Sequence, residues 1–259
     1  MRAKVISLVN QKGGVGKTTT AVSIASGLSI LGKKTLLVDN DAQANTTINL
    51  GFDPENLSKS LADCYLNSNS SVREILLETK IPNLHLIPSD ITLSEVQLSL
   101  ISQIGREKFL KDILEEVLGE YEYVIIDTAP SLELLSINAL VASNHVIIPI
   151  QTQFLALKGT KILLDTIKKI EDAFEHEIEI LGILPTMYDP RTNISKSSVE
   201  ILKKRFGELV FKNYIPRDVR LEENSALGET IWEYAPRCRA AKAYKEVLME
   251  LLEREKGKA

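Results

Sequence analysis

Residues 12 to 19 read Lys-Gly-Gly-Val-Gly-Lys-Thr-Thr and come directly after the apolar run Val5-Ile6-Ser7-Leu8-Val9. A strand that leads through glycines into a helix gathers several backbone N–H groups and the positive end of the helix dipole at one point. Such a point is suited to a polyphosphate. The stretch therefore predicts a strand, a phosphate-binding loop and a helix, in that order.

The residue types in this loop have separate tasks. Glycines lack a Cβ, so the backbone can curl around phosphate oxygens. Lys17 can bridge the terminal phosphates, and the hydroxyl of Thr18 can bind the Mg²⁺ that accompanies a nucleoside triphosphate. The predicted nucleotide-binding loop consists of Lys12, Gly13, Gly14, Val15, Gly16, Lys17, Thr18 and Thr19.

The loop departs from the ordinary P-loop pattern in two ways. Gln11 stands where that pattern has its first glycine, and a second lysine, Lys12, precedes the glycines. A glycine-rich turn without a ligand is the alternative interpretation. Two lysines and three glycines in this order, after an apolar strand, favour nucleotide binding.

The composition is that of an ordinary globular domain. The chain has 259 residues, of which 44% are hydrophobic and 25% charged, and we expect one domain over residues 1–259. No apolar run approaches the roughly 20 residues that span a bilayer, and the first strand begins too early for a targeting segment. Cys64 and Cys238 lie far apart in the sequence, which favours reduced thiols and a cytoplasmic location.

The charge is unevenly distributed. The net charge of −4 argues against a general nucleic-acid binder. Between Arg191 and Lys245, however, 12 Lys and Arg face 7 Asp and Glu, a local balance of +5 that leaves −9 for the remainder. This asymmetry indicates either an anionic partner such as DNA or simply solvated helix faces.

Short β-branched runs alternate with helical patterns along the whole chain. The runs are apolar almost without interruption, as is typical of strands covered on both faces. This alternation predicts an α/β fold with a mostly parallel sheet, helices on both faces, and the ligand at the carboxyl ends of the strands. The expected strands are Lys4–Val9, Thr35–Asp39, Leu84–Pro88, Tyr123–Asp127, His145–Ile150 and Ile180–Thr186, and the main helices are Lys17–Leu31, Gly105–Leu118, Leu155–Ala173 and Ser195–Phe206.

The last expected helix, Arg237–Glu255, is amphipathic. Its apolar side carries three pairs of neighbours, and its opposite side includes four glutamates. Anionic lipid would repel those glutamates, so we expect the helix to pack on the core and not to bind a membrane. The pairs are Ala243/Tyr244, Val247/Leu248 and Leu251/Leu252, and the glutamates are Glu246, Glu250, Glu253 and Glu255.

Acidic residues end two further strands. Asp39 and Asp41 follow the second strand, where carboxylates suit water positioning or metal contact, although a polar loop with Asp capping a turn has the same composition. Asp127 ends the strand Tyr123–Asp127, the arrangement in which a carboxylate holds Mg²⁺, usually through water. Beside a phosphate-binding loop, both positions are candidates for the nucleotide site.

Taken together, these residues resemble the ParA/Soj partition ATPases, part of the deviant-Walker class that also contains MinD and the nitrogenase iron protein. The resemblance covers essentially the whole chain. One departure is Ala42, where the family switch usually has proline, and it bears on switch rigidity and hydrolysis rate. The matching motifs are Lys12–Thr19, Asp39–Asn45, Ile125–Pro130, Ile148-Pro149-Ile150-Gln151, Arg191-Thr192-Asn193 and Ile215-Pro216-Arg217-Asp218-Val219-Arg220.

The resemblance implies an ATPase with ATP and Mg²⁺ as cofactors. The family binds ATP as a sandwich dimer, in which the lysine at the position of Lys12 reaches the nucleotide of the opposite subunit. A second cation there would stabilise charge on the transferred phosphoryl group. Asp41 matches the residue that positions the attacking water, so Lys12, Lys17 and Asp41 are the expected catalytic residues, and Thr18 and Asp127 the expected metal site. The family also places Thr186, Pro216 and Asp218 near the adenosine.

The implied function is DNA segregation. Arg191 and Arg220 match positions that bind DNA nonspecifically in the family dimer, and both fall in the basic segment. The expected cycle has an ATP-bound homodimer on nucleoid DNA, and a ParB-type centromere-binding protein that stimulates otherwise weak hydrolysis and releases the dimer. Because the chain begins at the loop strand, we expect no separate operator-reading domain. Chromosome and plasmid systems both fit.

Three alternatives belong to other functional classes. A MinD-like positioning ATPase needs a C-terminal membrane anchor, which the Glu-rich end and the tail Lys256-Gly257-Lys258-Ala259 supply poorly. An iron–sulfur reductase needs cluster cysteines, and neither cysteine is near the Asp41 or Asp127 segments. A ligase-like synthase of the same superfamily would need a substrate pocket that the sequence does not locate.

Overall fold

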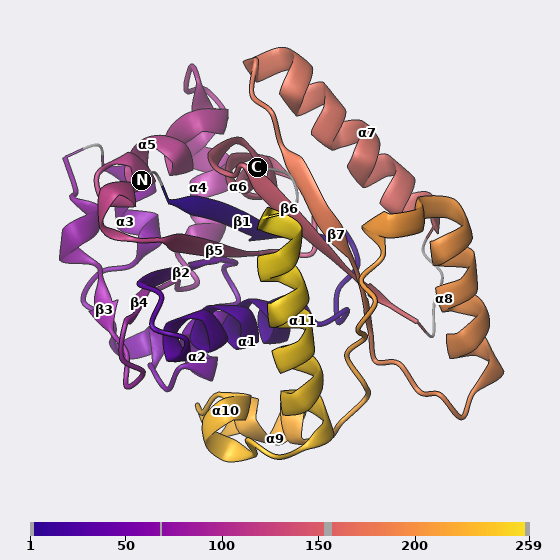
Figure 1. Cartoon of the computed structure of the whole chain (residues 1–259). Helices are drawn as coiled ribbons and strands as arrows, with labels where there is room; N and C mark the ends of the chain where they lie inside the picture. Colours follow the sequence, from indigo (N-terminus) through magenta and orange to yellow (C-terminus); the bar gives the residue numbers. More distant parts are fainter. Residues whose placement is uncertain (1–2, 68, 153–156, 257–259) are drawn as a thin grey trace.

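A seven-stranded sheet forms the centre of the computed structural model, which describes residues 3–67, 69–152 and 157–256. The strand order is β3-β4-β2-β5-β1-β6-β7 (Figure 1). Every paired neighbour is parallel except β3, which runs antiparallel to β4. The strands are β1 (Lys4–Leu8), β2 (Thr35–Asn40), β3 (Leu77–Glu78), β4 (Leu84–Ile87), β5 (Tyr123–Thr128), β6 (His145–Gln151) and β7 (Glu179–Thr186).

Helices cover both faces of this sheet. In Figure 1, α11 lies across the same face as α1, with α9 and α10 at its base. This face comprises α1 (Lys17–Ile30), α2 (Asn45–Asn49), α9 (Arg220–Ala226), α10 (Ile231–Tyr234) and α11 (Arg239–Lys256). The other layer comprises α3 (Leu61–Leu66), α4 (Leu93–Leu100), α5 (Phe109–Glu115), α6 (Leu134–Ala142) and α7 (Leu157–Phe174), with α8 (Asn193–Phe206) beyond β7. The predicted fold class is confirmed.

The strands are apolar without alternation because both of their faces are buried. On β6, Ile147 packs in the cluster formed with α1 and α11, whereas its neighbour Ile148 packs in the cluster formed with α7. Neither side chain is exposed to solvent. The predicted strands agree with the observed ones to within one or two residues, and only the two-residue β3 was not predicted.

Two predicted helices differ in extent. The pattern at Gly105–Leu118 forms a shorter α5, which is flanked by single 3₁₀ turns, and Gly105 itself has a φ of 71°. Helix α7 begins at Leu157, and the first two residues of its predicted range lie outside the described residues. The 3₁₀ turns of the chain are η1 (Pro54–Asn56), η2 (Val72–Glu74), η3 (Arg106–Lys108), η4 (Leu118–Glu120) and η5 (Gly207–Leu209).

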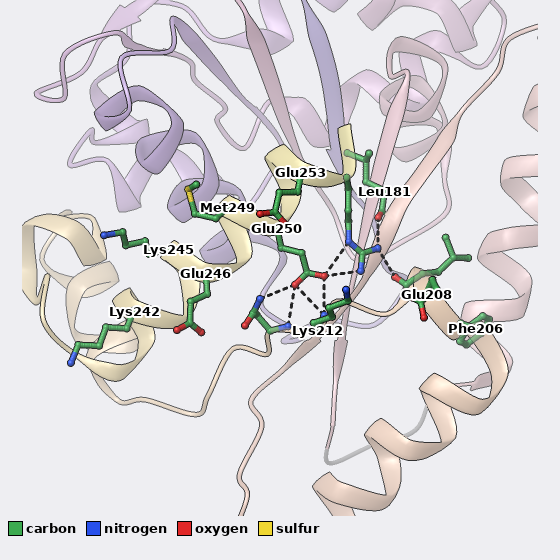
Figure 2. A pocket seen from close by; sticks show the side chains of 13 residues that line it. Leu181, Phe206, Glu208, Lys212, Lys242, Lys245, Glu246, Met249, Glu250 and Glu253 are labelled. Carbon is green, nitrogen blue, oxygen red and sulfur yellow. Dashed lines mark hydrogen bonds and ion pairs between the residues drawn. The ribbon is translucent and has the colours of Figure 1, made fainter. Parts of the chain in front are cut away.

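Helix α11 packs on the core as predicted, and two of the four glutamates on the side opposite its apolar pairs are themselves buried. Glu250 is 8% exposed and accepts hydrogen bonds from the backbone N–H of Lys212 (2.9 Å) and from Arg254 (2.8 Å) (Figure 2). Glu255 accepts from Lys4 Nζ (2.7 Å) and Tyr123 Oη (2.9 Å), which lie at the amino-terminal ends of β1 and β5. Both carboxylates are buried because they satisfy donors of the segments on which the helix docks. Residues 257–259 of the tail lie outside the described residues.

We predict that Glu250→Ala destabilises the protein by about 3 kcal/mol, because it leaves buried backbone N–H groups and Arg254 without their acceptor. Urea unfolding measures this, with Glu246→Ala, an exposed position on the same helix, expected to stay within about 0.5 kcal/mol. Burial alone would raise the pKa of Glu250. The hydrogen bonds from Lys212, Arg254 and Asn213 outweigh that effect, so the pKa is lowered overall. The stabilisation is therefore present above the unfolded pKa of the carboxyl and is lost as the pH falls through the folded value. Equal stability of the two variants at neutral pH would contradict the prediction.

Candidate nucleotide-binding site

The glycine-rich loop joins the carboxyl end of β1 to the first turn of α1. Gly14 and Gly16 have φ values of 68° and 86°, in the left-handed region that favours glycine. Helix α1 begins at Lys17, and Gly16 is its N-cap without a side-chain cap. The first N–H groups of the helix are therefore available to an anion.

Two buried side chains, one just before the loop and one from β7, hold the loop. Asn10 accepts from the N–H of Lys12 (2.9 Å) and donates to the carbonyl of Pro149 on β6 (2.7 Å). Thr186, at the end of β7, donates its hydroxyl to the carbonyl of Val15 (2.8 Å). Asn10 was not predicted as a site residue, although a polar residue directly after a buried strand is a usable signal.

Lys17 lies 6% exposed at the start of α1, with its ammonium 3.4 Å from the carbonyl of Lys12. Burial lowers the pKa of Lys17, and the negative charges of Asp127 and Asp41 oppose that shift. A desolvated cation held between a phosphate-binding loop and two carboxylates is suited to contact the terminal phosphates of a nucleotide.

Asp127 is the penultimate residue of β5 and is completely buried. Its Oδ2 accepts from the hydroxyl of Thr46 (2.9 Å), and the side chain of Thr18 also hydrogen-bonds to it. Its Oδ1 has no hydrogen-bond partner among the described residues. Burial raises the pKa of Asp127 to about 6, against the opposing effect of these bonds. A buried carboxylate oxygen without a partner, beside a threonine hydroxyl, fits the oxygen ligands that Mg²⁺ requires.

The two acidic residues at the carboxyl end of β2, Asp39 within the strand and Asp41 just after it, have different surroundings. Asp39 is fully buried and accepts from both the N–H and the hydroxyl of Thr47, each at 2.8 Å. Burial, together with the charge of Asp127 on the neighbouring strand, raises the pKa of Asp39 to about 8. Asp41 is 8% exposed and accepts from the N–H of Gln43 (3.0 Å). Asp39 is thus a structural group, and Asp41 is the more accessible carboxylate.

Thr46 and Thr47 are site residues that the sequence did not indicate. They lie at the start of α2. Thr46 donates to Asp127, which is 81 residues away in the sequence, and Thr47 donates to Asp39 on β2. The N–H of Ser89, in the loop after β4, donates to the hydroxyl of Thr47 (3.0 Å). We call residues 41–44, between β2 and α2, the switch loop. Helix α2 therefore connects the switch loop to both buried carboxylates.

A cavity of about 200 Å³ opens beside the glycine-rich loop, between the ends of β7 and α11. Gly16 and Thr19 line it together with the three residues expected near the adenosine, Thr186, Pro216 and Asp218. Asp218 also accepts from the N–H of Ala240 at the start of α11 (3.3 Å). The structure thus brings the predicted adenosine residues to one wall of a pocket next to the loop.

Comparison with known proteins agrees with this geometry. A family model described as an AAA domain matches residues 3–180. The sporulation initiation inhibitor protein Soj of Bacillus subtilis is 42% identical, over 96% of this chain and 98% of its own length. The chromosome-partitioning ATPase Soj of Treponema pallidum is 39% identical, over 97% of this chain and 98% of its own length. The chain belongs to the ParA/Soj family of partition ATPases.

A solved structure extends the likeness to the nucleotide-bound state of another protein. A Mycobacterium smegmatis protein described as cobyrinic acid a,c-diamide synthase, with bound ADP and magnesium, is 34% identical to this partition ATPase. The two superimpose with a TM-score of 0.86 over 99% of this chain and 97% of that chain. The resemblance inferred from the sequence motifs is therefore confirmed.

The signature lysine of this partition ATPase has a partner within its own chain. Lys12 Nζ donates to Oε1 of Gln151 at the end of β6 (3.1 Å). Gln151 belongs to the matching motif Ile148–Gln151, and Pro149 of the same motif accepts from Asn10. The motif thus holds the start of the loop, and an action of Lys12 on a second subunit stays a prediction.

The two arginines predicted to bind DNA each pair with a nearby aspartate. Arg191 donates to Asp189 (2.8 Å) and its side chain is 87% exposed. Arg220 lies 3.6 Å from Asp218, and its side chain is 47% exposed. Exposed ion pairs contribute little and exchange readily with other anions, so both guanidinium groups remain accessible to phosphate.

Among the described helices, none is both long enough and apolar enough to cross a membrane. Cys64 and Cys238 are free and buried, and the described part of the chain contains no cluster of three His, Cys, Asp or Glu residues suited to a metal.

We predict that Thr186→Val lowers ATP affinity about fivefold, because the lost hydrogen bond to Val15 is worth about 1 kcal/mol in holding the loop. Calorimetry measures the affinity. Thr166→Val is the matched control, because it removes a similar hydroxyl bond (2.9 Å to Ile162) within α7, on the other layer of the fold. Unchanged affinity in Thr186→Val would show that the bond does not position the loop.

Proposed function

We propose that this partition ATPase binds ATP with Mg²⁺, dimerises, binds DNA without sequence specificity and releases it when a partner stimulates hydrolysis. The observation that carries the proposal is the group formed by Lys17, Thr18 and the unpartnered carboxylate oxygen of Asp127, next to the glycine-rich loop. This group supplies a cation, a hydroxyl and a buried anion where the β- and γ-phosphates with their metal would lie. We further propose that residues 1–259 form one nucleotide-binding domain.

Each residue of the site has a defined role in the proposed reaction. The backbone N–H groups of the loop and Lys17 bind and orient the phosphates. Thr18 and Asp127 would hold Mg²⁺, which neutralises charge on the phosphates when bound. Asp41, the accessible carboxylate at the end of β2, orients the attacking water, and Lys12 would act on the nucleotide of a second subunit.

We predict that Asp41→Ala binds ATP but accumulates as a dimer, because hydrolysis no longer returns it to the monomer. Lys12→Ala should bind ATP as a monomer and lose the dimer and most of its turnover. Size-exclusion chromatography with ATP and phosphate-release assays measure these effects, with Lys17→Ala as the variant that loses productive ATP binding. If Asp41→Ala stays monomeric, or if mixing it with Lys12→Ala gives no heterodimer above the Lys12→Ala background, the corresponding role is wrong.

The basic segment supports DNA as the anionic partner. Arg191 and Arg220 are exposed, and guanidinium groups suit phosphate oxygens. A dimer brings four such arginines together, which would make DNA binding depend on ATP. Phosphate contacts position a protein without reading bases, so the binding should be insensitive to sequence.

We predict that the double variant Arg191→Ala/Arg220→Ala loses most of its DNA affinity while ATP binding and dimerisation are retained. If each of four arginines neutralises one phosphate, the log–log salt slope is about −3.6, and the variant should lose most of it. Fluorescence anisotropy with ATP, with ADP and without nucleotide measures the affinity. If the variant dimerises normally and its DNA affinity and salt dependence are unchanged, the two arginines do not bind DNA and only form ion pairs with their aspartates.

The proposed setting is the cytoplasm and the nucleoid, with a ParB-type centromere-binding protein as partner. Two observations weigh against the alternatives. The face of α11 that a membrane anchor would use is packed on the core through Tyr244, Val247 and Leu251. Relatives at 39% and 35% identity are named for chromosome partitioning, whereas amide synthesis is named in the descriptions of three Mycobacterium smegmatis structures at 33 to 34% identity. Phosphate release with DNA and the partner, but without an amide substrate, would separate partition from synthesis.

A further inference from the structure

A second hollow of this protein lies against the switch loop, outside the nucleotide pocket. It has a volume of about 640 Å³ and lies between the switch loop, α2, η1 and the loop that precedes α4. We call it the switch groove, and its lining includes Ala42, Ala44, Ile48, Glu55, Asp90 and Ile91.

The switch groove presents apolar side chains to solvent. Ile48 on α2 is 42% exposed and Ile91 is 68% exposed. Phe52, which also lines the groove, is partly buried and packs against the hydrophobic core. Apolar surface of this kind gathered around a hollow is typical of a binding site for another apolar side chain.

The charged residues that line the groove are all acidic. Asp53, Glu55 and Asp90 line it, and none of the described residues in its lining is Lys or Arg. Asp53 and Asp90 cap local turns through the N–H groups of Glu55 and Thr92, which fixes their carboxylates near the rim. An occupant that is both apolar and cationic would complement this surface.

Helix α2 connects the switch groove to the reacting part of the nucleotide site. Ile48 faces the groove, while Thr46 bonds to Asp127. Ala44 lines the groove, has a φ of 52°, and donates its N–H to the carbonyl of Asp41 (2.9 Å). Because a non-glycine residue in this conformation is held in place by its surroundings, a change in contacts there alters the loop that carries Asp41.

We propose that the switch groove binds a short cationic segment of the protein that stimulates hydrolysis, with an apolar side chain between Ile48 and Ile91. Lysine or arginine residues of that segment lie against Asp53, Glu55 and Asp90. Binding shifts the position of Asp41 and Thr46 through α2 and thereby accelerates hydrolysis. The inference rests on the proposed function, because it places the stimulating partner of that same site.

The test uses two substitutions in the groove, Glu55→Lys and Ile91→Asp. Both side chains are exposed, so the fold tolerates the changes, which circular dichroism and urea unfolding verify. The probe is the full-length ParB-type protein from the same organism, titrated into each variant with ATP and DNA while phosphate release is followed. We expect unchanged basal hydrolysis and ATP-dependent dimerisation, and an increase of about tenfold or more in the partner concentration for half-maximal stimulation.

The matched controls lie on α7, on the other layer of the fold. Ile162→Asp replaces a side chain that is 43% exposed, and Asp172→Lys reverses an exposed charge; both should be stimulated like the wild type. Groove variants with normal stimulation would overturn the inference and leave the proposed function standing. Loss of the ATP-dependent dimer in Ile91→Asp would overturn it as well, by assigning the groove to the contact between two copies. Absence of stimulation in the wild type would overturn both the groove's role and partner-stimulated hydrolysis.

Discussion

Two carboxylates buried side by side govern the arrangement of this site. Asp39 and Asp127 are directly paired in the register of β2 and β5, and neither is exposed to solvent. Two negative charges there would be very costly. Burial raises the pKa of both carboxyls, and the charge of Asp127 raises that of Asp39 further. Asp39 therefore holds a proton more readily than Asp127 does. The unpartnered oxygen of Asp127 is the group that attracts a cation to this end of the sheet.

The same constraint explains the position of α2. A buried carboxyl needs hydrogen-bond donors, and the start of α2 supplies them from consecutive threonines, Thr46 to Asp127 and Thr47 to Asp39. The helix is thus fixed by the chemistry of the site and not by its own five-residue length. A change in the ionisation or metal contact of Asp127 must act on α2, and a movement of α2 must act on Asp127. This reciprocity makes the switch loop a natural point of control.

The sequence predicted what is encoded locally. The glycine-rich loop needs only adjacent residues and a preceding apolar strand, and Asp127 is recognisable because it ends such a strand. The bond from Thr46 could not be predicted, because Asp127 lies 81 residues away and nothing in the threonine itself marks the contact. The position of Asn10 after a buried strand marks it as a candidate, but its acceptor, the carbonyl of Pro149, lies 139 residues away. The burial of Glu250 could not be predicted for a related reason: a glutamate on an amphipathic helix is normally solvated, and only the folded chain brings Lys212 and Asn213 to it.

One carboxylate joins the nucleotide pocket to the basic segment. Asp218 lines the pocket with Gly16 and also lies 3.6 Å from the guanidinium of Arg220, while its Oδ1 accepts from the N–H of that same residue. A ligand that contacts Asp218 in the pocket therefore changes the pairing of Arg220, and an anion that captures Arg220 changes the carboxylate offered to the pocket. Coupling between two binding sites is reciprocal in free energy. Under the proposed function, if ATP binding raises the affinity for DNA through Asp218, DNA binding must raise the affinity for ATP by the same factor.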